Sequence, residues 1–201
     1  MSSGGDWRTT PAAALTDGSD FLHLLKENGH SAPSTTSQHA GTIDTPTEGT
    51  TILAIRYREG VLVAGDRRAT AGNVIVYDRA AKVLSVDDRS VMALSGSPAS
   101  AYEIARLLEI SFQHYRRTQL QELSLDGRLR TLSRLLRDNL PMAMQGIGAV
   151  VPIYATYEDG NPREGTEAGG KIFFYDVLGA TFESVDFCTT GSGSPIIRGA
   201  L

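Results

Sequence analysis

The sequence predicts an α+β fold in which two antiparallel sheets pack face to face and helices cover the outside. Short segments rich in β-forming residues follow one another with tight turns between them, and such hairpin-linked strands form antiparallel sheets. Two long helical patterns interrupt this series, and a further helix begins near the end. Every apolar face is buried most simply when the two sheets pack against each other. The chain has 201 residues, of which 41% are hydrophobic, so it can form a substantial core.

Residues 1–49 differ in composition from the rest and are predicted to be a leader. Ser, Thr, Gly and Pro make up 23 of these 49 residues, so the segment buries too little apolar surface to offset its ordering entropy. We predict that it is largely disordered, apart from a short helix near 19–28 with an apolar face. That helix is interpreted either as transient or as an element that docks on the folded body. Residues 50–201 are the predicted folded domain.

The first predicted hairpin brings a carboxylate beside the start of its first strand. It consists of a strand over 51–57, a turn at 58–60 and an apolar strand over 61–65. If the turn centres between Arg58 and Gly60, then Thr50 and Thr51 lie opposite the segment Asp66–Arg68. The side chain of Asp66 is therefore expected near Thr50.

The rest of the chain continues with strands, two helices and more strands. Residues 67–73 are predicted to be a polar loop. Predicted strands cover 74–77 and 81–86, which are expected to pair, then 90–94, 149–157, 171–176 and 181–188. Ser97 and Pro98 are suited to start a helix that reaches about residue 117, and a second helix covers about 126–144 with a break or kink at Pro141. A Gly-Ser-Pro segment then starts the final helix.

Composition and charge exclude several function classes. The net charge of −4 gives no basic field for nucleic acid, and the row of Arg128, Arg130, Arg134 and Arg137 is expected mostly on a solvated helix face. No apolar run approaches the ~20 residues of a membrane helix, and the N-terminus lacks the pattern of a secretory signal. The single cysteine, Cys188, fits a reducing compartment and a small core residue.

Familiar catalytic and metal sites are also poorly supported. The domain after residue 49 has one histidine, His114, inside a predicted helix, which disfavours a Ser-His-Asp triad. No motif places His114 beside Cys188. Clustered metal ligands are absent from the sequence pattern, so no metal and no cofactor is expected, and no phosphate-binding loop is indicated.

Threonine chemistry remains, with Thr50 as the nucleophile. A Thr hydroxyl needs a base, and an α-amine with a pKa of about 7.7–8.0 can serve when Thr is the first residue. This requires self-cleavage at Gly49-Thr50, where Gly49 tolerates strained backbone geometry. The Thr50 hydroxyl would attack the preceding carbonyl, and water would then release the leader from the resulting ester.

Three further residues complete the chemistry suggested by the sequence. Lys82 would keep the Thr50 amine partly deprotonated, Asp66 would orient Lys82, and the Gly96 N–H near a helix N-terminus would stabilise an oxyanion. Each also has a purely structural interpretation. Asp66 can form a surface ion pair with its neighbouring arginines, Lys82 can be an exposed strand lysine, and Gly96 can serve only a turn.

The motifs together resemble a known family. The segments that carry the resemblance are Gly49–Ile52, Ala64–Thr70, Lys82-Val83, Ser95–Ser97 and Gly191–Ser194. In this order and spacing the chain resembles an actinobacterial 20S proteasome β subunit with its propeptide, of the N-terminal-nucleophile hydrolases. The resemblance implies a four-layer αββα sandwich. It also implies that Ser192 supports the Thr50 amine, and that Ala69, Leu94 and Pro98 line a specificity pocket for hydrophobic residues.

The resemblance further implies partners and a location. Family members form stacked seven-membered rings of the type α7β7β7α7 with proteasome α subunits and other β subunits, in the cytoplasm. A ring ATPase supplies unfolded protein substrates, and no metal or organic cofactor takes part. No nucleic-acid or membrane partner is expected.

The end of the chain departs from the family pattern. Family members continue beyond the Gly-Ser-Gly-Ser segment, whereas this chain stops at Leu201, one turn into a helix. We therefore expect a sandwich that is incomplete at the C-terminus, in a fragment or a truncated product. Two alternatives stay open: a catalytically silent or truncated ring subunit, and the two-ring bacterial threonine peptidase. The second normally lacks so long a leader and the pair Arg67-Arg68.

Overall fold

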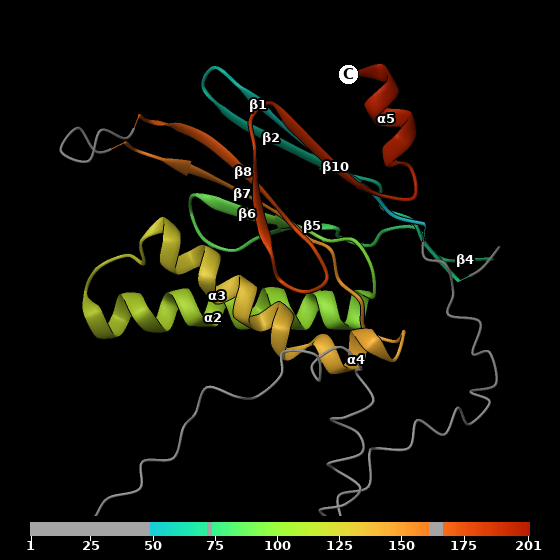
Figure 1. Cartoon of the computed structure of the whole chain (residues 1–201), viewed down its shortest axis with the longest axis horizontal. Helices are drawn as coiled ribbons and strands as arrows, with labels where there is room; N and C mark the ends of the chain where they lie inside the picture. Colours follow the sequence, from blue (N-terminus) through green and yellow to red (C-terminus); the bar gives the residue numbers. More distant parts are fainter. Residues whose placement is uncertain (1–48, 72–73, 161–166) are drawn as a thin grey trace, which may run out of the picture. The chain divides into compact units, whose positions relative to one another are not determined.

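The computed structural model describes residues 49–71, 74–160 and 167–201. The leader, including the helix predicted near 19–28, lies outside the described residues apart from Gly49. The described residues form stacked layers of helices and sheets (Figure 1). None of the helices in these ranges is both long enough and apolar enough to cross a bilayer.

Three antiparallel sheets contain the strands of the described residues. The first has the order β10 (Phe187–Gly191), β1 (Thr51–Tyr57), β2 (Gly60–Gly65). The second is the small pair β3 (Ala69–Ala71) and β4 (Val74–Tyr77). The third has the order β5 (Val83–Ser85), β6 (Ser90–Ala93), β7 (Ile153–Glu158), β8 (Gly169–Tyr175), β9 (Thr181–Ser184).

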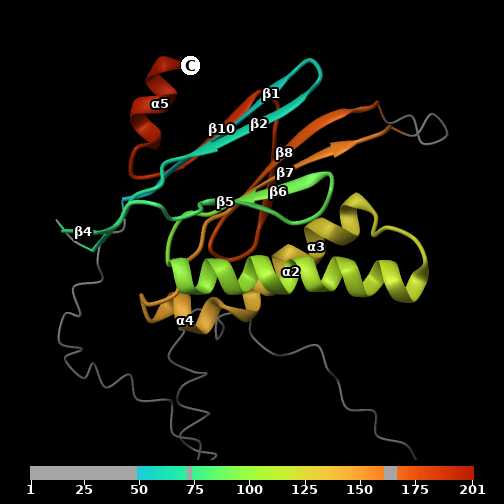
Figure 2. The ribbon, with the colours of Figure 1, turned by 180° about the vertical axis from the view of Figure 1, so that it is seen from behind.

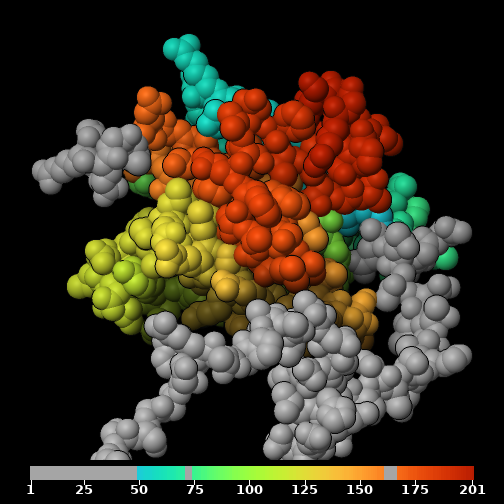
Figure 3. All heavy atoms as spheres, in the orientation of Figure 1, coloured from blue at the N-terminus to red at the C-terminus, as the bar shows by residue number. Residues whose placement is uncertain are grey.

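Helices lie on the outer sides of the two larger sheets. Helices α2 (Pro98–Gln119) and α3 (Leu125–Asp138) run along one face of the five-stranded sheet. Figure 2 shows the same ribbon from behind, with both helices on the same side of this sheet. The short helix α4 (Leu140–Met144) follows α3, and α5 (Ser194–Ala200) lies beside β10 beyond the three-stranded sheet. In the space-filling view, α3 (yellow) and α5 (red) stand on opposite sides of the strands (Figure 3).

Two apolar cores hold these layers together. One lies between the five-stranded sheet and the helices, and its fully buried members include Met92, Leu108, Leu132 and Tyr175. The other lies between the two larger sheets, around Ile52, Ile153 and Ile172. The layers therefore alternate as helix, sheet, sheet, helix, which confirms the αββα sandwich predicted from the sequence.

Two predicted strand arrangements are wrong. Strand β4 pairs with β3, inside the segment predicted to be a polar loop, and not with β5. A strand of three residues is too short to show the alternation by which strands are recognised. The segment predicted as one strand over 181–188 is divided between β9 and β10, which belong to different sheets. The alternation of apolar and polar residues cannot reveal where a chain passes from one sheet to another, because strands in both sheets alternate with the same period of two residues.

The helical predictions need smaller corrections. The second helix breaks at Asn139, and Pro141 lies in the first turn of α4, where a missing N–H costs nothing. The row of arginines is not uniformly solvated, because Arg128 is only 6% exposed. Its guanidinium donates to Glu122 at 3.1 Å and to Glu158 at 3.4 Å. Arg128 therefore joins α3 to the end of β7.

Candidate active site

The junction between Gly49 and Thr50 lies at the entrance to strand β1. Thr50 is only 4% exposed. The β1–β2 hairpin pairs Ile52 with Gly65, the last residue of β2, so the residue after the strand, Asp66, reaches the level of Thr51. The Asp66 N–H donates to the Thr51 carbonyl at 3.0 Å, and the Thr51 N–H donates to Asp66 Oδ1 at 2.7 Å. Asp66 therefore lies beside the nucleophile candidate, at the register that the turn sets.

The side chain of Lys82 reaches the same junction from the segment before β5. Its Nζ donates to the Gly49 carbonyl oxygen at 3.1 Å, and this is the carbonyl of the peptide bond between Gly49 and Thr50. The same nitrogen lies 3.0 and 2.9 Å from the two oxygens of Asp66, and 2.6 Å from the Arg68 carbonyl oxygen. Four oxygen atoms thus surround Nζ, and the side chain is 10% exposed. This surrounding suits a charged ammonium group.

The contacts of Asp66 explain its electrostatics. Partial burial raises the pKa of the Asp66 carboxyl, but hydrogen bonds from Lys82, the Thr51 N–H and the Arg68 N–H lower this pKa by a larger amount. The pKa consequently lies below its ordinary value of 3.8. A carboxylate that keeps its charge holds the ammonium in place, so Asp66 is a fixed counter-ion for Lys82 at neutral pH.

Gly96 and Ser192 approach the junction from other parts of the fold. Gly96 lines a small cavity together with Gly49 and Thr50. Its φ of +108° and the adjacent carbonyl oxygen of Ala149, with which a Cβ would collide, explain why glycine occupies this position. The Ser192 hydroxyl, which follows β10, donates to the Thr50 carbonyl oxygen at 3.4 Å.

The three residues expected in a specificity pocket line that same small cavity. Its volume is about 30 Å³, and Ala69, Leu94 and Pro98 contribute apolar surface to it. Ala81, Ala101 and Tyr102 also line it. The structure therefore brings together every site residue expected from the sequence, around one peptide bond.

Sequence reasoning missed two contacts at this junction. The Gly49 N–H donates to the Thr70 hydroxyl at 3.0 Å, and the Arg68 carbonyl accepts from Lys82. Both partners lie in the segment predicted as a loop. The contact of the Arg68 carbonyl could not be predicted, because every residue has a backbone carbonyl. The contact of Thr70 could not be predicted, because the sequence did not reveal that Thr70 lies on a strand.

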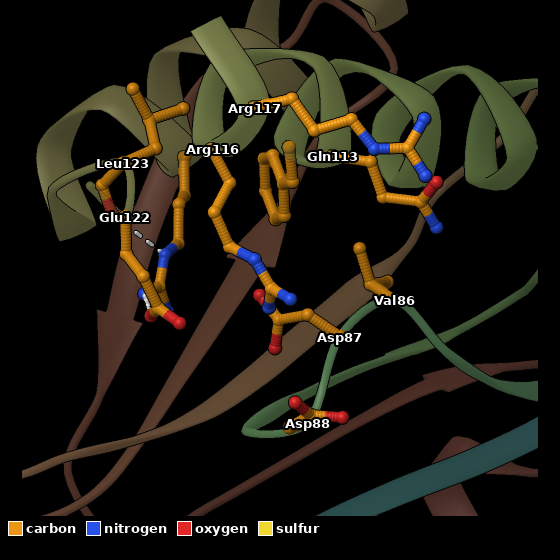
Figure 4. A pocket seen from close by; sticks show the side chains of 10 residues that line it. Val86, Asp87, Asp88, Gln113, Arg116, Arg117, Glu122 and Leu123 are labelled. Atoms are coloured by element: carbon orange, nitrogen blue, oxygen red, sulfur yellow. Dashed lines mark hydrogen bonds and ion pairs between the residues drawn. The ribbon is translucent and has the colours of Figure 1, made fainter. Parts of the chain in front are cut away.

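A second hollow lies away from this junction, between the end of α2 and the β5–β6 turn. Its volume is about 320 Å³, and the side chains of Asp87, Arg116 and Glu122 point into it (Figure 4). It contains both signs of charge, and the buried Arg128 beneath it is already paired. This hollow has no group in the geometry of a nucleophile and base.

The cysteine and the histidine of the domain lie apart from this junction, in the core between the sheets and on the surface of α2. No group of three or more His, Cys, Asp or Glu side chains in residues 49–71, 74–160 and 167–201 is arranged to hold a metal ion. Cys188 lies in the core between the sheets, where burial raises the pKa of its thiol. His114 is exposed on α2. These positions fit the expectation that Cys188 is a core residue.

Comparisons with known proteins find relatives of this chain among bacterial proteasome β subunits. Proteasome subunit beta 2 of Thermomonospora curvata is 47% identical over 154 residues, which cover 76% of this chain and 52% of the relative. A proteasome subunit beta of Acidothermus cellulolyticus is 44% identical over 153 residues, with the same two coverages of 76% and 52%. A proteasome subunit beta of Jonesia denitrificans is 37% identical over 196 residues, which cover 96% of this chain and 63% of the relative.

The match extends over most of this chain but only part of each relative. The chain spans about half of the length of the first two relatives and less than two thirds of the third. The proteasome subunit family model matches residues 47–201, which include the whole described sandwich and the Gly49-Thr50 junction. The chain belongs to the proteasome subunit family.

Proposed function

We propose that this chain is a threonine-type endopeptidase subunit of a proteasome core, activated by self-cleavage between Gly49 and Thr50. One observation carries the proposal: an ammonium group, held by a carboxylate, donates to the carbonyl oxygen of the bond to be cut. The interpretation of Lys82 as an exposed lysine in a surface ion pair does not account for its contact with the Gly49 carbonyl oxygen. The names of the relatives, each a proteasome subunit beta, support the same assignment.

The first reaction is an acyl transfer within the chain. The Thr50 oxygen attacks the Gly49 carbonyl carbon while its proton passes to the Thr50 nitrogen, which becomes the leaving amine. The bond between the Gly49 carbon and the Thr50 nitrogen breaks, and an ester between Gly49 and the Thr50 oxygen remains. Lys82 stabilises the negative charge that develops on the Gly49 oxygen. Water then hydrolyses the ester to give the free leader acid and the Thr50 hydroxyl.

Loss of the leader creates the group needed for peptide hydrolysis. The new α-amine of Thr50 accepts the hydroxyl proton, which is possible because such amines titrate near neutral pH. Lys82 and Asp66 set the electrostatic field around it, and Ser192 supports its position. The Gly96 N–H is the proposed donor to the substrate oxyanion.

The small apolar cavity is the proposed specificity pocket. Ala69, Leu94 and Pro98 present apolar surface next to Thr50. A pocket with mainly apolar walls favours hydrophobic side chains immediately before the cut bond, because burying a polar or charged side chain against apolar surface is costly.

We further infer the assembly in which this subunit works. Its proposed partners are proteasome α subunits and other β subunits in seven-membered rings, α7β7β7α7, with a ring ATPase that delivers unfolded proteins. The proposed location is the cytoplasm.

Substitution of Thr50 tests the proposal. We expect Thr50→Ala, produced together with α subunits, to retain the leader and to hydrolyse no fluorogenic peptide, whereas Thr50→Ser keeps a hydroxyl and retains both reactions. Intact mass and peptide turnover are measured on the same samples. Removal of the leader at residue 49 in Thr50→Ala would exclude self-cleavage. A wild-type protein that keeps its leader would favour a catalytically silent ring subunit.

A further inference from the structure

Strand β3 places a hydroxyl against the backbone of the leader's last residue. The Gly49 N–H donates to the Thr70 Oγ1 at 3.0 Å. Thr70 pairs with Ile75 of β4, directly after an irregularity in the β3–β4 register at Ala69. The hydroxyl therefore sits on a strand that is itself paired, and its bond to Gly49 connects that strand to the residue before Thr50.

The peptide groups around Gly49 are consequently held on both sides. The group before Gly49 is fixed through its N–H by Thr70, and the group after it is fixed through its carbonyl by Lys82. The next carbonyl, of Thr50, accepts from Ser192 at 3.4 Å. The N–H and the carbonyl of Gly49 lie on either side of its α-carbon, so holding both restricts its two free dihedral angles.

This restraint matters because glycine has more backbone freedom than any other residue. Without the Thr70 acceptor, Gly49 would sample conformations in which its carbonyl turns away from Lys82 and from the Thr50 hydroxyl. A reaction between neighbouring groups depends on how often they meet in the correct orientation.

We propose that Thr70 is a positioning residue for self-cleavage: its hydroxyl orients the Gly49 carbonyl for attack by Thr50. The proposal rests on the proposed function and adds a residue to it. Thr70 acts through Gly49 and transfers no proton to the reacting atoms. Since Gly49 departs with the leader, this contact exists only before cleavage.

The Thr70 hydroxyl also limits the size of the residue at position 49. A Cβ added to Gly49 would lie 3.3 Å from Thr70 Oγ1, closer than most side-chain carbons approach an oxygen, and 3.9 Å from Ser192 Oγ. Thr70 therefore both orients glycine and crowds a larger residue. The effects of substitutions at positions 49 and 70 on the cleavage rate should not be independent.

The test compares Thr70→Val with Thr70→Ser in the full chain, produced together with α subunits. Valine keeps the shape but removes the acceptor, and serine keeps the acceptor. The rate of leader loss is followed by intact mass after protein synthesis is stopped. We expect Thr70→Val to slow leader loss roughly 5- to 30-fold, the factor that corresponds to freeing the backbone of one residue. The rate of leader loss in Thr70→Ser should remain within about 3-fold of the wild-type rate, because serine keeps the hydroxyl acceptor and the hydrogen bond is not lost.

A matched control removes a hydroxyl elsewhere. Thr181 in β9 contacts the Ser133 hydroxyl at 3.1 Å and is not near the junction, so Thr181→Val should process at the wild-type rate. Gly49→Ala provides a second readout. This substitution should slow leader loss by a smaller factor in a Thr70→Ala background than in the wild type, because the Thr70 oxygen that crowds the added Cβ is gone. If Thr70→Val does not fold, Thr70→Ala removes the same acceptor and replaces it in the comparison.

The outcomes separate this inference from the proposed function. Equal rates for wild type and Thr70→Val would overturn the positioning role, and so would a Thr70→Ser variant as slow as Thr70→Val. In either case, retention of the leader by Thr50→Ala would still support self-cleavage. Retention of the leader by the wild type would overturn both.

Discussion

Replacing Lys82 with methionine separates the chemical role of this residue from its structural role. Methionine has nearly the same length and can occupy the same partly buried path, but it donates no hydrogen bond. The variant loses the contact of 3.1 Å to the Gly49 carbonyl and the ion pair with Asp66. It leaves the apolar layers of the sandwich unchanged.

The expected stability change is modest. Asp66 is 36% exposed and keeps the N–H donors of Thr51 and Arg68, so its carboxylate is still hydrogen-bonded and reaches solvent. A pair between a buried and a partly exposed group is screened, and its loss should cost about 1–2 kcal/mol of unfolding free energy. The expected change in chemistry is larger. Removal of one preorganised donor to a developing oxyanion slows a reaction by roughly 10²–10³-fold, or about 3–4 kcal/mol in the barrier.

The assay measures both quantities on one preparation. Leader loss is followed by intact mass, and unfolding is followed by urea titration of the same protein. Lys171→Met is the matched control, because it makes the same change at a lysine of β8 in the other large sheet. A Lys82→Met variant that loses its leader within about 5-fold of the wild-type rate would refute the role of Lys82. A variant that does not fold would show instead that the lysine is mainly structural.

Two other predictions concern charges at and away from the junction. Asp66→Asn should destabilise the protein by a constant amount between about pH 5 and 8, and the difference from wild type should shrink only below about pH 4. The reason is that the pKa of Asp66 is lowered from 3.8, so its stabilising charge is present above that value and lost as the pH falls through the lower folded pKa. Melting temperatures across this range check the sign, and a difference that already disappears near pH 6 would contradict it. Arg128→Met should cost about 1–2 kcal/mol in urea unfolding, because it removes a buried guanidinium that pairs with the two partly exposed carboxylates of Glu122 and Glu158. Arg130→Met, at an exposed pair, should change stability by less than about 1 kcal/mol, and equal effects at both positions would refute this explanation.

The sequence predicted the parts of the site that depend on local geometry. A hairpin turn sets the register of its two strands, so the position of Asp66 opposite Thr51 followed from the turn at Arg58. The strand-to-helix turn at Gly96 was likewise visible, because Ser97 and Pro98 are typical of a helix start. The core face of α2 followed from the spacing of its apolar residues.

Contacts that depend on distant pairing could not be predicted in the same way. The structure places Lys82 at the junction although β4 and β5 do not pair as expected, because the chain after β4 returns toward β2 with the Ala80 N–H bound to the Arg67 carbonyl. The approach of Ser192 depends on β10 leaving the sheet of β9 to pair with β1. No local pattern in the residues around 185 marks that change of sheet.

The identity of the first residue in the assembled protein tests the central proposal most directly. N-terminal sequencing, together with intact mass, should show a chain that begins at Thr50 and lacks the mass of residues 1–49. A chain that still begins at the leader, or that begins at any residue other than Thr50, would contradict the account.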